Sequence, residues 1–255
     1  MRNGGSYALW VAWGAERATH PSNYDIYYKY FYEPSPSNWQ WSNEVRLAPA
    51  SWDYSGMDQE PSIIQTQDGT IWVAWCSDVD SDYDIYLTRS IDFGATWEQP
   101  YNITNNQNTE DMYPSITRII DNTANEYIWI AWHSNSDGDD EIYYTELDPV
   151  SMTRGSILPL TQNEYQDRHS TIMQTNNGNI WIAWDRLTAA NSFEVYYTFT
   201  SNWGASWSTP VDITNDSHVD QTPWLTQTWD GKVWVVWATD RAGNLEIYTM
   251  CGVQP

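Results

Sequence analysis

The chain has 255 residues, with 34 acidic and 11 basic side chains and a net charge of −23. Such a charge repels nucleic-acid phosphates and anionic lipids, so we expect no nucleic-acid partner and no membrane insertion. The aromatic residues include 18 Trp and 18 Tyr against 4 Phe, a composition that suits packed β-sheets and sugar-facing surfaces.

In chain order, one apolar pentapeptide with two tryptophans recurs five times. It has no polar alternation, which is typical of a strand buried on both faces. The copies are Leu9–Trp13, Ile71–Trp75, Ile128–Trp132, Ile180–Trp184 and Val233–Trp237, and their first tryptophans are 52 to 62 residues apart. The chain is therefore built from repeats of about 50 residues.

Three further short strands accompany each pentapeptide. An inner strand precedes it, with copies at Pro61–Gln65, Pro114–Thr117, Ser170–Gln174 and Pro223–Gln227. An acidic-aliphatic-Tyr strand follows it, beginning at Asp25, Asp84, Glu141, Glu194 and Glu246. A fourth strand ends near Val45–Leu47, Asn102–Thr104, Leu158–Thr161 and Asp212–Thr214. Four short strands per repeat predict an all-β fold, a β-propeller of four-stranded blades.

We expect a single propeller domain over residues 1–255, with repeat units at about 1–57, 58–110, 111–166, 167–219 and 220–255. The first unit lacks most of an inner strand and the last unit lacks a fourth strand. We therefore expect five blades, of which the first and last are incomplete. Ring closure could be imperfect, the chain could be a fragment of a larger propeller, or a partner, including a second copy, could supply strands. A solenoid of the same units is the alternative architecture.

One octapeptide, Ser90–Trp97, matches the Asp-box pattern Ser-x-Asp-x-Gly-x-Thr-Trp, and Thr200–Trp207 is a degenerate copy. The chain thus resembles the sialidase-like propellers with Asp-boxes, also called bacterial neuraminidase repeats. In that family the octapeptide is a turn remote from the active site. The residues agree with a structural role for Ser90, Asp92, Gly94 and Trp97, because Asp can accept backbone N–H bonds, Gly permits a positive φ, and the indole can pack beneath the turn.

Sialidase chemistry is not expected. The enzymes of this family carry an Arg-Ile-Pro element, three arginines for the substrate carboxylate and a Tyr–Glu nucleophile pair. Arg-Ile-Pro does not occur in this sequence, and its arginines show no triad pattern. The resemblance therefore implies the fold without the family's catalytic motif.

An aspartate stands at the same offset before each inner strand, at Asp58, Asp111, Asp167 and Asp220. A ring of carboxylates at the mouth of a propeller channel could bind a cation or supply acid and base for glycosidic cleavage, which makes these four the candidate catalytic residues. Because they recur in every unit, the favoured interpretation is structural, with each carboxylate accepting local backbone hydrogen bonds.

Residues that confer specificity should instead differ between the repeats. The neighbours of the four aspartates do differ, and we select as candidate ligand-binding residues Glu60, Tyr113, Arg168, His169 and Trp224. The four histidines are scattered and have no metal-type spacing, so we expect no catalytic or zinc site built from histidines.

Two acidic loops follow the pentapeptides of the second and third units. Oxygen ligands at alternate positions, with a glycine turn in the second loop, suit Ca²⁺. The candidate metal ligands are Asp78, Asp80, Asp82, Asp84, Asp137, Asp139 and Glu141. A solvated acidic turn is the competing interpretation.

The leading functional hypothesis is a non-catalytic, secreted or cell-surface propeller that binds a glycan or protein ligand at the channel mouth, although no signal peptide is recognisable at the N-terminus. One alternative is a glycoside hydrolase or polysaccharide lyase that uses carboxylates of the inner strands. Another is a structural repeat module of a larger surface protein. The two cysteines, Cys76 and Cys251, lie in distant repeats, and free thiols are favoured over a disulfide.

Overall fold

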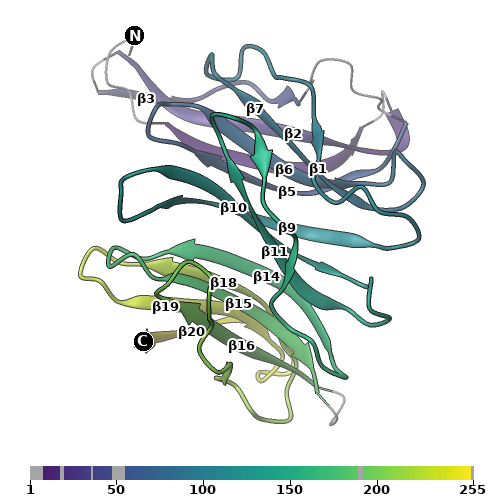
Figure 1. Cartoon of the computed structure of the whole chain (residues 1–255). Helices are drawn as coiled ribbons and strands as arrows, with labels where there is room; N and C mark the ends of the chain where they lie inside the picture. Colours follow the sequence, from purple (N-terminus) through teal and green to yellow (C-terminus); the bar gives the residue numbers. More distant parts are fainter. Residues whose placement is uncertain (1–7, 18–19, 36, 48–54, 189–191, 254–255) are drawn as a thin grey trace. The chain divides into compact units, whose positions relative to one another are not determined.

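The computed structural model describes residues 8–17, 20–35, 37–47, 55–188 and 192–253, which form twenty strands in five antiparallel sheets (Figure 1). This confirms the predicted all-β fold of five propeller blades. No helix that could cross a membrane occurs in the described residues. Contacts divide the chain into two compact units, residues 1–107 and 108–255. A single domain over the whole chain stays a prediction.

The first unit holds two blades. Blade 1 comprises β1 (Leu9–Arg17), β2 (His20–Ser35), β3 (Asn38–Trp41) and β4 (Val45–Arg46), with both short strands paired to β2. Blade 2 comprises β5 (Asp58–Gln65), β6 (Ile71–Ser77), β7 (Asp84–Ser90) and β8 (Tyr101–Asn102), in the spatial order β5-β6-β7-β8. The pentapeptide Ile71–Trp75 therefore lies in β6, the second strand of blade 2, whereas Leu9–Trp13 lies in β1, the first strand that the structure describes in blade 1.

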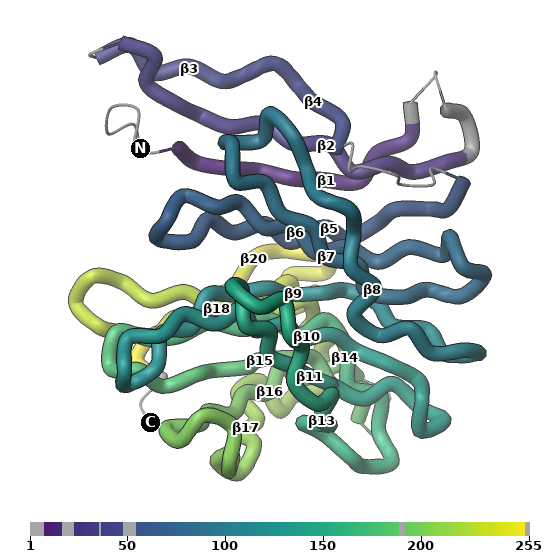
Figure 2. Tube along the Cα trace, turned by 45° about the horizontal axis from the view of Figure 1, so that its top comes forward, coloured from purple at the N-terminus to yellow at the C-terminus, as the bar shows by residue number. Residues whose placement is uncertain are grey.

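The second unit holds three blades. Blade 3 comprises β9 (Asp111–Ile120), β10 (Glu126–Ser134), β11 (Glu141–Asp148), β12 (Thr153–Arg154) and β13 (Leu158–Pro159). Blade 4 comprises β14 (Gln166–Gln174), β15 (Ile180–Leu187), β16 (Phe193–Thr200) and β17 (Val211–Asp212). Blade 5 comprises β18 (Asp220–Gln227), β19 (Val233–Thr239) and β20 (Glu246–Val253). Figure 2 follows the hairpins of these blades along the Cα trace.

The first and last blades are incomplete within the described residues. No inner strand precedes β1 in blade 1, and no fourth strand pairs with β20 in blade 5. In the described structure β1 and β20 are therefore edge strands of their sheets, and an edge strand can accept another strand. Self-association through these edges stays a prediction, which light scattering would test.

Apolar side chains are buried between neighbouring blades of the same unit. In the first unit, Ile26 and Tyr28 of blade 1 pack against Ile71, Val73 and Trp75 of blade 2. In the second unit, one cluster joins blades 3 and 4 and another joins blades 4 and 5. The pentapeptide of blade 4 has two apolar faces because Ile180, Ile182 and Trp184 pack against blade 3, whereas Trp181 and Ala183 pack against blade 5.

The octapeptide Ser90–Trp97 forms a turn that contacts the preceding blade. Asp92 accepts hydrogen bonds from the Thr96 backbone N–H at 2.8 Å and from the Thr96 hydroxyl at 2.5 Å. These bonds, with one from Ser90, lower the pKa of Asp92 to about 2. Trp97 is buried, and the hydroxyl of Tyr28 in blade 1 donates to the Gly94 carbonyl at 2.8 Å. The turn therefore joins two blades.

The Gly94→Ala variant tests this contact between the turn and blade 1. Gly94 has φ of 80°, and a Cβ there would lie 3.3 Å from both Trp10 and the Tyr28 hydroxyl. We expect a loss of about 1–3 kcal/mol in unfolding free energy, measured by chemical denaturation. Gly69→Ala is the matched control, because φ is 94° and no atom lies within 4 Å of its Cβ. Equal losses in the two variants would contradict a packing role for the turn.

Candidate functional site

The four repeat aspartates lie inside the blades, where each binds the second tryptophan of its own pentapeptide. The indole Nε1 atoms donate at 3.0, 2.9, 2.9 and 2.7 Å in the pairs Trp75–Asp58, Trp132–Asp111, Trp184–Asp167 and Trp237–Asp220. All four aspartates are at most 3% exposed. Because each carboxylate is buried and binds an indole of its own blade, their geometry favours a structural role over catalysis.

Arginine side chains also bind two of these four aspartates. Asp167 also accepts bonds from Arg186 Nε and Nη2 at 2.7 and 2.9 Å, and Asp220 accepts one from Arg241 at 3.0 Å. The charges of Asp167 and Asp220 are thus compensated within the protein.

A second repeated feature is a backbone bulge at a position whose side chain varies between the blades. Two residues after each aspartate, the backbone turns to a positive φ at a β-bulge, with values of 49°, 55°, 49° and 53° at Glu60, Tyr113, His169 and Thr222. Left-handed non-glycine residues cost about 1–3 kcal/mol and persist only where the surroundings enforce them. The backbone is therefore common to the repeats, and only the side chain differs between the blades.

The position after each pentapeptide also differs between the blades. Its residues are Gly14, Cys76, His133, Asp185 and Ala238. In blade 3 the ring of His133 stacks on Tyr113, with centroids 5.3 Å apart, and in blade 4 His169 Nδ1 lies 2.8 Å from Asp185 Oδ2. The two variable positions of a blade thus contact each other.

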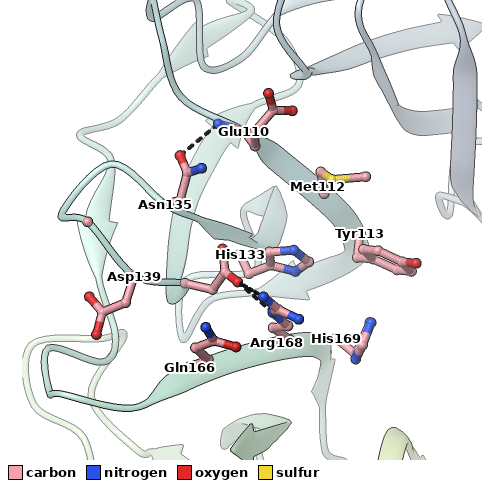
Figure 3. Close-up of a pocket in the computed structure, with 11 residues that line it drawn as sticks. Glu110, Met112, Tyr113, His133, Asn135, Asp139, Gln166, Arg168 and His169 are labelled. Carbon is pink, nitrogen blue, oxygen red and sulfur yellow. Dashed lines mark hydrogen bonds and ion pairs between the residues drawn. The ribbon is translucent and has the colours of Figure 1, made fainter.

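Tyr113, His133 and His169 line a pocket of about 530 Å³ in the second unit, between the inner strands of blades 3 and 4 (Figure 3). We call it the histidine pocket, and its principal lining residues are Glu110, Tyr113, His133, Asp140, Arg168 and His169. The His169 ring meets Tyr113 edge-on at 4.5 Å and lies 5.9 Å from His133. The structure thus corrects the expectation that the histidines are scattered, since two of them share one site.

His133 is held uncharged. It is 5% exposed, and burial, together with the nearby His169 and Arg168, lowers its pKa to about 3. Its Nδ1 atom is buried without a hydrogen-bond partner in the described part of the chain. The ring therefore contributes an apolar, aromatic wall and one unsatisfied polar atom.

His169 is held by a buried carboxylate. Asp185 is fully buried, and the same Oδ2 atom that contacts His169 also accepts the Thr222 backbone N–H at 2.7 Å. A carboxylate at Nδ1 fixes the ring orientation and leaves Nε2 as the atom available for a ligand. This assignment makes His169 the best-positioned acid–base group of the pocket.

Acidic side chains predominate among the charged groups of the pocket, since Glu110, Asp139 and Asp140 stand against the single Arg168. Arg168 forms an ion pair with Asp140 across the pocket wall, and these side chains are 34% and 14% exposed. Glu110 lies at the opposite end, where its backbone N–H donates to Asn135 Oδ1 at 2.8 Å (Figure 3). Because the acidic residues outnumber the one arginine, the pocket does not suit an anionic ligand.

The structure brings together three of the five candidate ligand-binding residues. Tyr113, Arg168 and His169 line the histidine pocket, whereas Glu60 lines a separate pocket in the first unit. Trp224 is 61% exposed on β18 and lines neither pocket. The sequence analysis missed His133, Asp140 and Asp185. His133 and Asp185 could have been identified from the sequence, because they occupy the variable position directly after the pentapeptide.

Several candidate calcium ligands have protein hydrogen-bond partners. Asp80 and Asp137 accept tyrosine hydroxyls at 2.7 Å, and Asp84 accepts the Thr104 hydroxyl at 2.6 Å. Within the described residues, the acidic groups close enough to share a cation are instead Glu194, Asp216 and Asp220. Arg241 lies 2.8 Å from Asp216 and 3.0 Å from Asp220, so a positive charge already stands there.

Calcium binding at the acidic loops stays a prediction. We expect titration calorimetry to show weak Ca²⁺ binding, with Kd in the range of about 10⁻⁴–10⁻³ M, that weakens in the Asp82→Asn and Asp139→Asn variants. An absence of heat, with a melting temperature unchanged by Ca²⁺, would show that these loops are solvated turns.

The two cysteines are both free thiols, with Cys76 buried and Cys251 exposed.

Known proteins resemble this chain in fold but not in sequence. No family model and no curated protein matches the sequence. A protein of unknown function from Dyadobacter fermentans DSM 18053 gives a TM-score of 0.69 at 12% identity, over 96% of this chain and 75% of that one. A Hadza microbial sialidase gives 0.58 at 13% identity, over 89% and 52%. An endo-arabinase from Bacteroides thetaiotaomicron VPI-5482 gives 0.55 at 11% identity, over 96% and 94%. Similarity at these identities establishes a shared fold.

Proposed function

We propose that the protein recognises a neutral glycan in the histidine pocket and does not cleave it. The observation that carries this proposal is the convergence of repeat-breaking side chains, since Tyr113, His133, Arg168 and His169 all line one pocket. A volume of about 530 Å³ suits a small ligand. Two of the similar structures are a sialidase and an arabinase, which supports a glycan as the ligand class.

The chemistry of the pocket agrees with a sugar ligand. The rings of Tyr113, His133 and His169 offer apolar faces beside polar edges, which is how proteins hold the mixed surface of a sugar. Arg168 and Asp140 supply donors and acceptors for hydroxyl groups. The excess of acidic side chains in the pocket and the −23 net charge of the chain favour a neutral glycan over an acidic one. An extracellular or cell-surface location is part of this proposal, because polymeric glycans are found there.

Binding is tested by a neutral-oligosaccharide array that includes arabinan fragments, followed by calorimetry with the best binder. The Arg168→Gln and His169→Gln variants should each bind at least about tenfold more weakly, since each removes hydrogen bonds worth about 1–2 kcal/mol. Trp224→Ala is the matched control, because this exposed side chain lies outside the pocket lining. We expect it to retain binding within about twofold.

Two outcomes would count against this proposal. An array without binders would leave a protein ligand or a purely structural role as the better hypothesis. Binding that is lost in Trp224→Ala but kept in the two pocket variants would move the site to the surface of blade 5.

A second candidate function, glycan cleavage, is favoured by the His169–Asp185 pair. A histidine oriented by a buried carboxylate is an arrangement used for general acid–base catalysis. The array oligosaccharides should then be assayed for product release. Cleavage by the wild type that disappears in Asp185→Asn, while binding persists, would establish catalysis and overturn the non-catalytic assignment.

A further inference from the structure

Blades 3 and 4 meet at a buried group of acids and hydrogen-bond donors. Glu141 of β11 and Asp167 of β14 both accept hydrogen bonds from the Asn163 side-chain amide, at 3.2 and 2.7 Å. Arg186, which pairs with Asp167 in the β14–β15 ladder, donates to the same carboxylate at 2.7 and 2.9 Å. An amide and a guanidinium thus supply donors to the two acids at this interface.

The interface between blades 4 and 5 repeats this group with a carboxylate in place of the amide. Glu194 and Asp220 occupy the repeat positions of the two acids. Asp216 occupies the position of Asn163, since the backbone N–H of each donates to the glutamate of its own interface, at 2.5 Å for Asn163 and 3.3 Å for Asp216. Oxygen atoms of Glu194, Asp216 and Asp220 all lie within 4.8 Å of one another.

These three carboxylates carry more negative charge than their surroundings balance. Arg241 lies 2.8 Å from Asp216 and 3.0 Å from Asp220, so it compensates one of the three charges. Glu194 and Asp220 are at most 3% exposed, and burial, together with neighbouring carboxylates, raises the pKa of Glu194. His218 Nδ1 lies 2.9 Å from Asp216 and adds a positive charge only when it is protonated. With His218 neutral, two negative charges remain, which favours a divalent cation.

A buried hydroxyl faces the same carboxylates. Thr239 lies directly opposite Asp220 in the β18–β19 pairing, and opposed residues of antiparallel strands direct their side chains to the same face. That face packs against blade 4, because Trp237, two residues earlier on β19, belongs to the cluster that the two blades share. Thr239 is fully buried, and its Oγ1 has no hydrogen-bond partner in the described part of the chain. In blade 4 the equivalent position holds the guanidinium of Arg186, whereas Thr239 offers an oxygen ligand.

The equivalent hydroxyls of Ser77 and Ser134 in blades 2 and 3 also have no hydrogen-bond partner among the described residues. Within that part of the chain, however, Thr239 is the one that stands beside three acids close enough to share a cation. Residues 189–191, which lie outside the described residues, are Ala-Ala-Asn and add no ionisable side chain to the count of charges.

We propose that Glu194, Asp216 and Asp220 bind a calcium ion between blades 4 and 5, with Thr239 Oγ1 as a further ligand. Ca²⁺ takes oxygen ligands at about 2.3–2.6 Å, so two ligands of one ion can lie up to about 5 Å apart, which accommodates the spacing of the three carboxylates. Mg²⁺ requires about 2.0–2.1 Å and near-octahedral geometry, which suits this spacing less well. The site does not rest on the function proposed for the histidine pocket, because none of these residues lines that pocket.

The test is calorimetric titration of the full chain with CaCl₂ and with MgCl₂, after a chelator has removed bound metal. We expect Ca²⁺ to bind with Kd of about 10⁻⁴ M or tighter, and Mg²⁺ at least about tenfold more weakly. Calcium at about a hundred times Kd should raise the melting temperature by about 5–10 °C. Asp216→Asn, which copies Asn163 of the neighbouring interface, should weaken Ca²⁺ binding at least about tenfold, and Thr239→Val about two- to tenfold. Melting curves without calcium show that the variants are folded.

Controls separate this site from general attraction to an acidic protein and from the acidic loops. Ser134→Ala removes the equivalent hydroxyl of blade 3, and Glu126→Gln removes one charge from a salt bridge with Arg118 in the same unit. Both variants, and the loop variants Asp82→Asn and Asp139→Asn, should keep the calcium affinity of the wild type at this site.

Three results would overturn the proposal. They are an absence of calcium heat, calcium binding that is unchanged in Asp216→Asn, and calcium binding that is lost in the loop variants instead. Magnesium binding as tight as calcium binding would contradict the choice of ion. None of these results changes the array result for the histidine pocket.

Discussion

Asp167→Ala should reduce the free energy of unfolding by about 3–5 kcal/mol, because it removes one partner of a buried ion pair. Asp167 is fully buried and accepts hydrogen bonds from Trp184, Arg186 and Asn163 at 2.7–2.9 Å. Without the carboxylate, the Arg186 guanidinium, 15% exposed, loses its closest counter-charge, and the indole N–H loses its acceptor. Urea denaturation, monitored by the many tryptophans, measures the loss.

Glu98→Ala provides the comparison for Asp167→Ala. Glu98 pairs with Arg89 at 2.9 Å on the surface, and such exposed pairs contribute about 0–1 kcal/mol. The Asp167→Ala variant should therefore lose several times more unfolding free energy than the Glu98→Ala variant. If both variants unfolded at the same urea concentration, the structural role of the repeat aspartates would be wrong, and Asp167 would return to the catalytic candidates.

Glu141→Gln should change how stability depends on pH. Glu141 is 1% exposed, and burial, with the neighbouring Asp167 charge, raises its pKa from 4.5 to about 7. Between pH 4.5 and about pH 7, the folded state therefore binds more protons than the unfolded state. The stabilisation from the protonated side chain is fully present below pH 4.5 and is lost as pH rises to about 7. A shift of this size corresponds to at most about 3 kcal/mol.

Glutamine at position 141 carries no charge, so the variant should not lose this stabilisation as pH rises. Relative to the wild type, Glu141→Gln should therefore gain stability between pH 4.5 and pH 7.5, by up to about 3 kcal/mol, as measured by urea denaturation across that range. The difference between the two proteins is the useful quantity, because acidic groups remote from position 141 contribute equally to both. A difference that stays constant with pH would show that Glu141 titrates normally.

The candidate site was predictable only in part. Tyr113, Arg168 and His169 were selected because they vary beside a constant aspartate, and they do line one pocket. His133 and Asp185 follow a constant pentapeptide, and the same reasoning applied there would have identified them. Asp140 could not be identified in this way, because it is one of many acids in a loop, and only its contact with Arg168 distinguishes it.

The sequence by itself determined the repeat and the strands, because apolar periodicity and turn residues are local properties that each copy repeats. Only the tertiary structure decided the roles of side chains. It placed the repeat aspartates against the tryptophan indoles and brought His133 beside His169, which is 36 residues away in sequence. These contacts join different strands and blades, so neither spacing nor composition could reveal them.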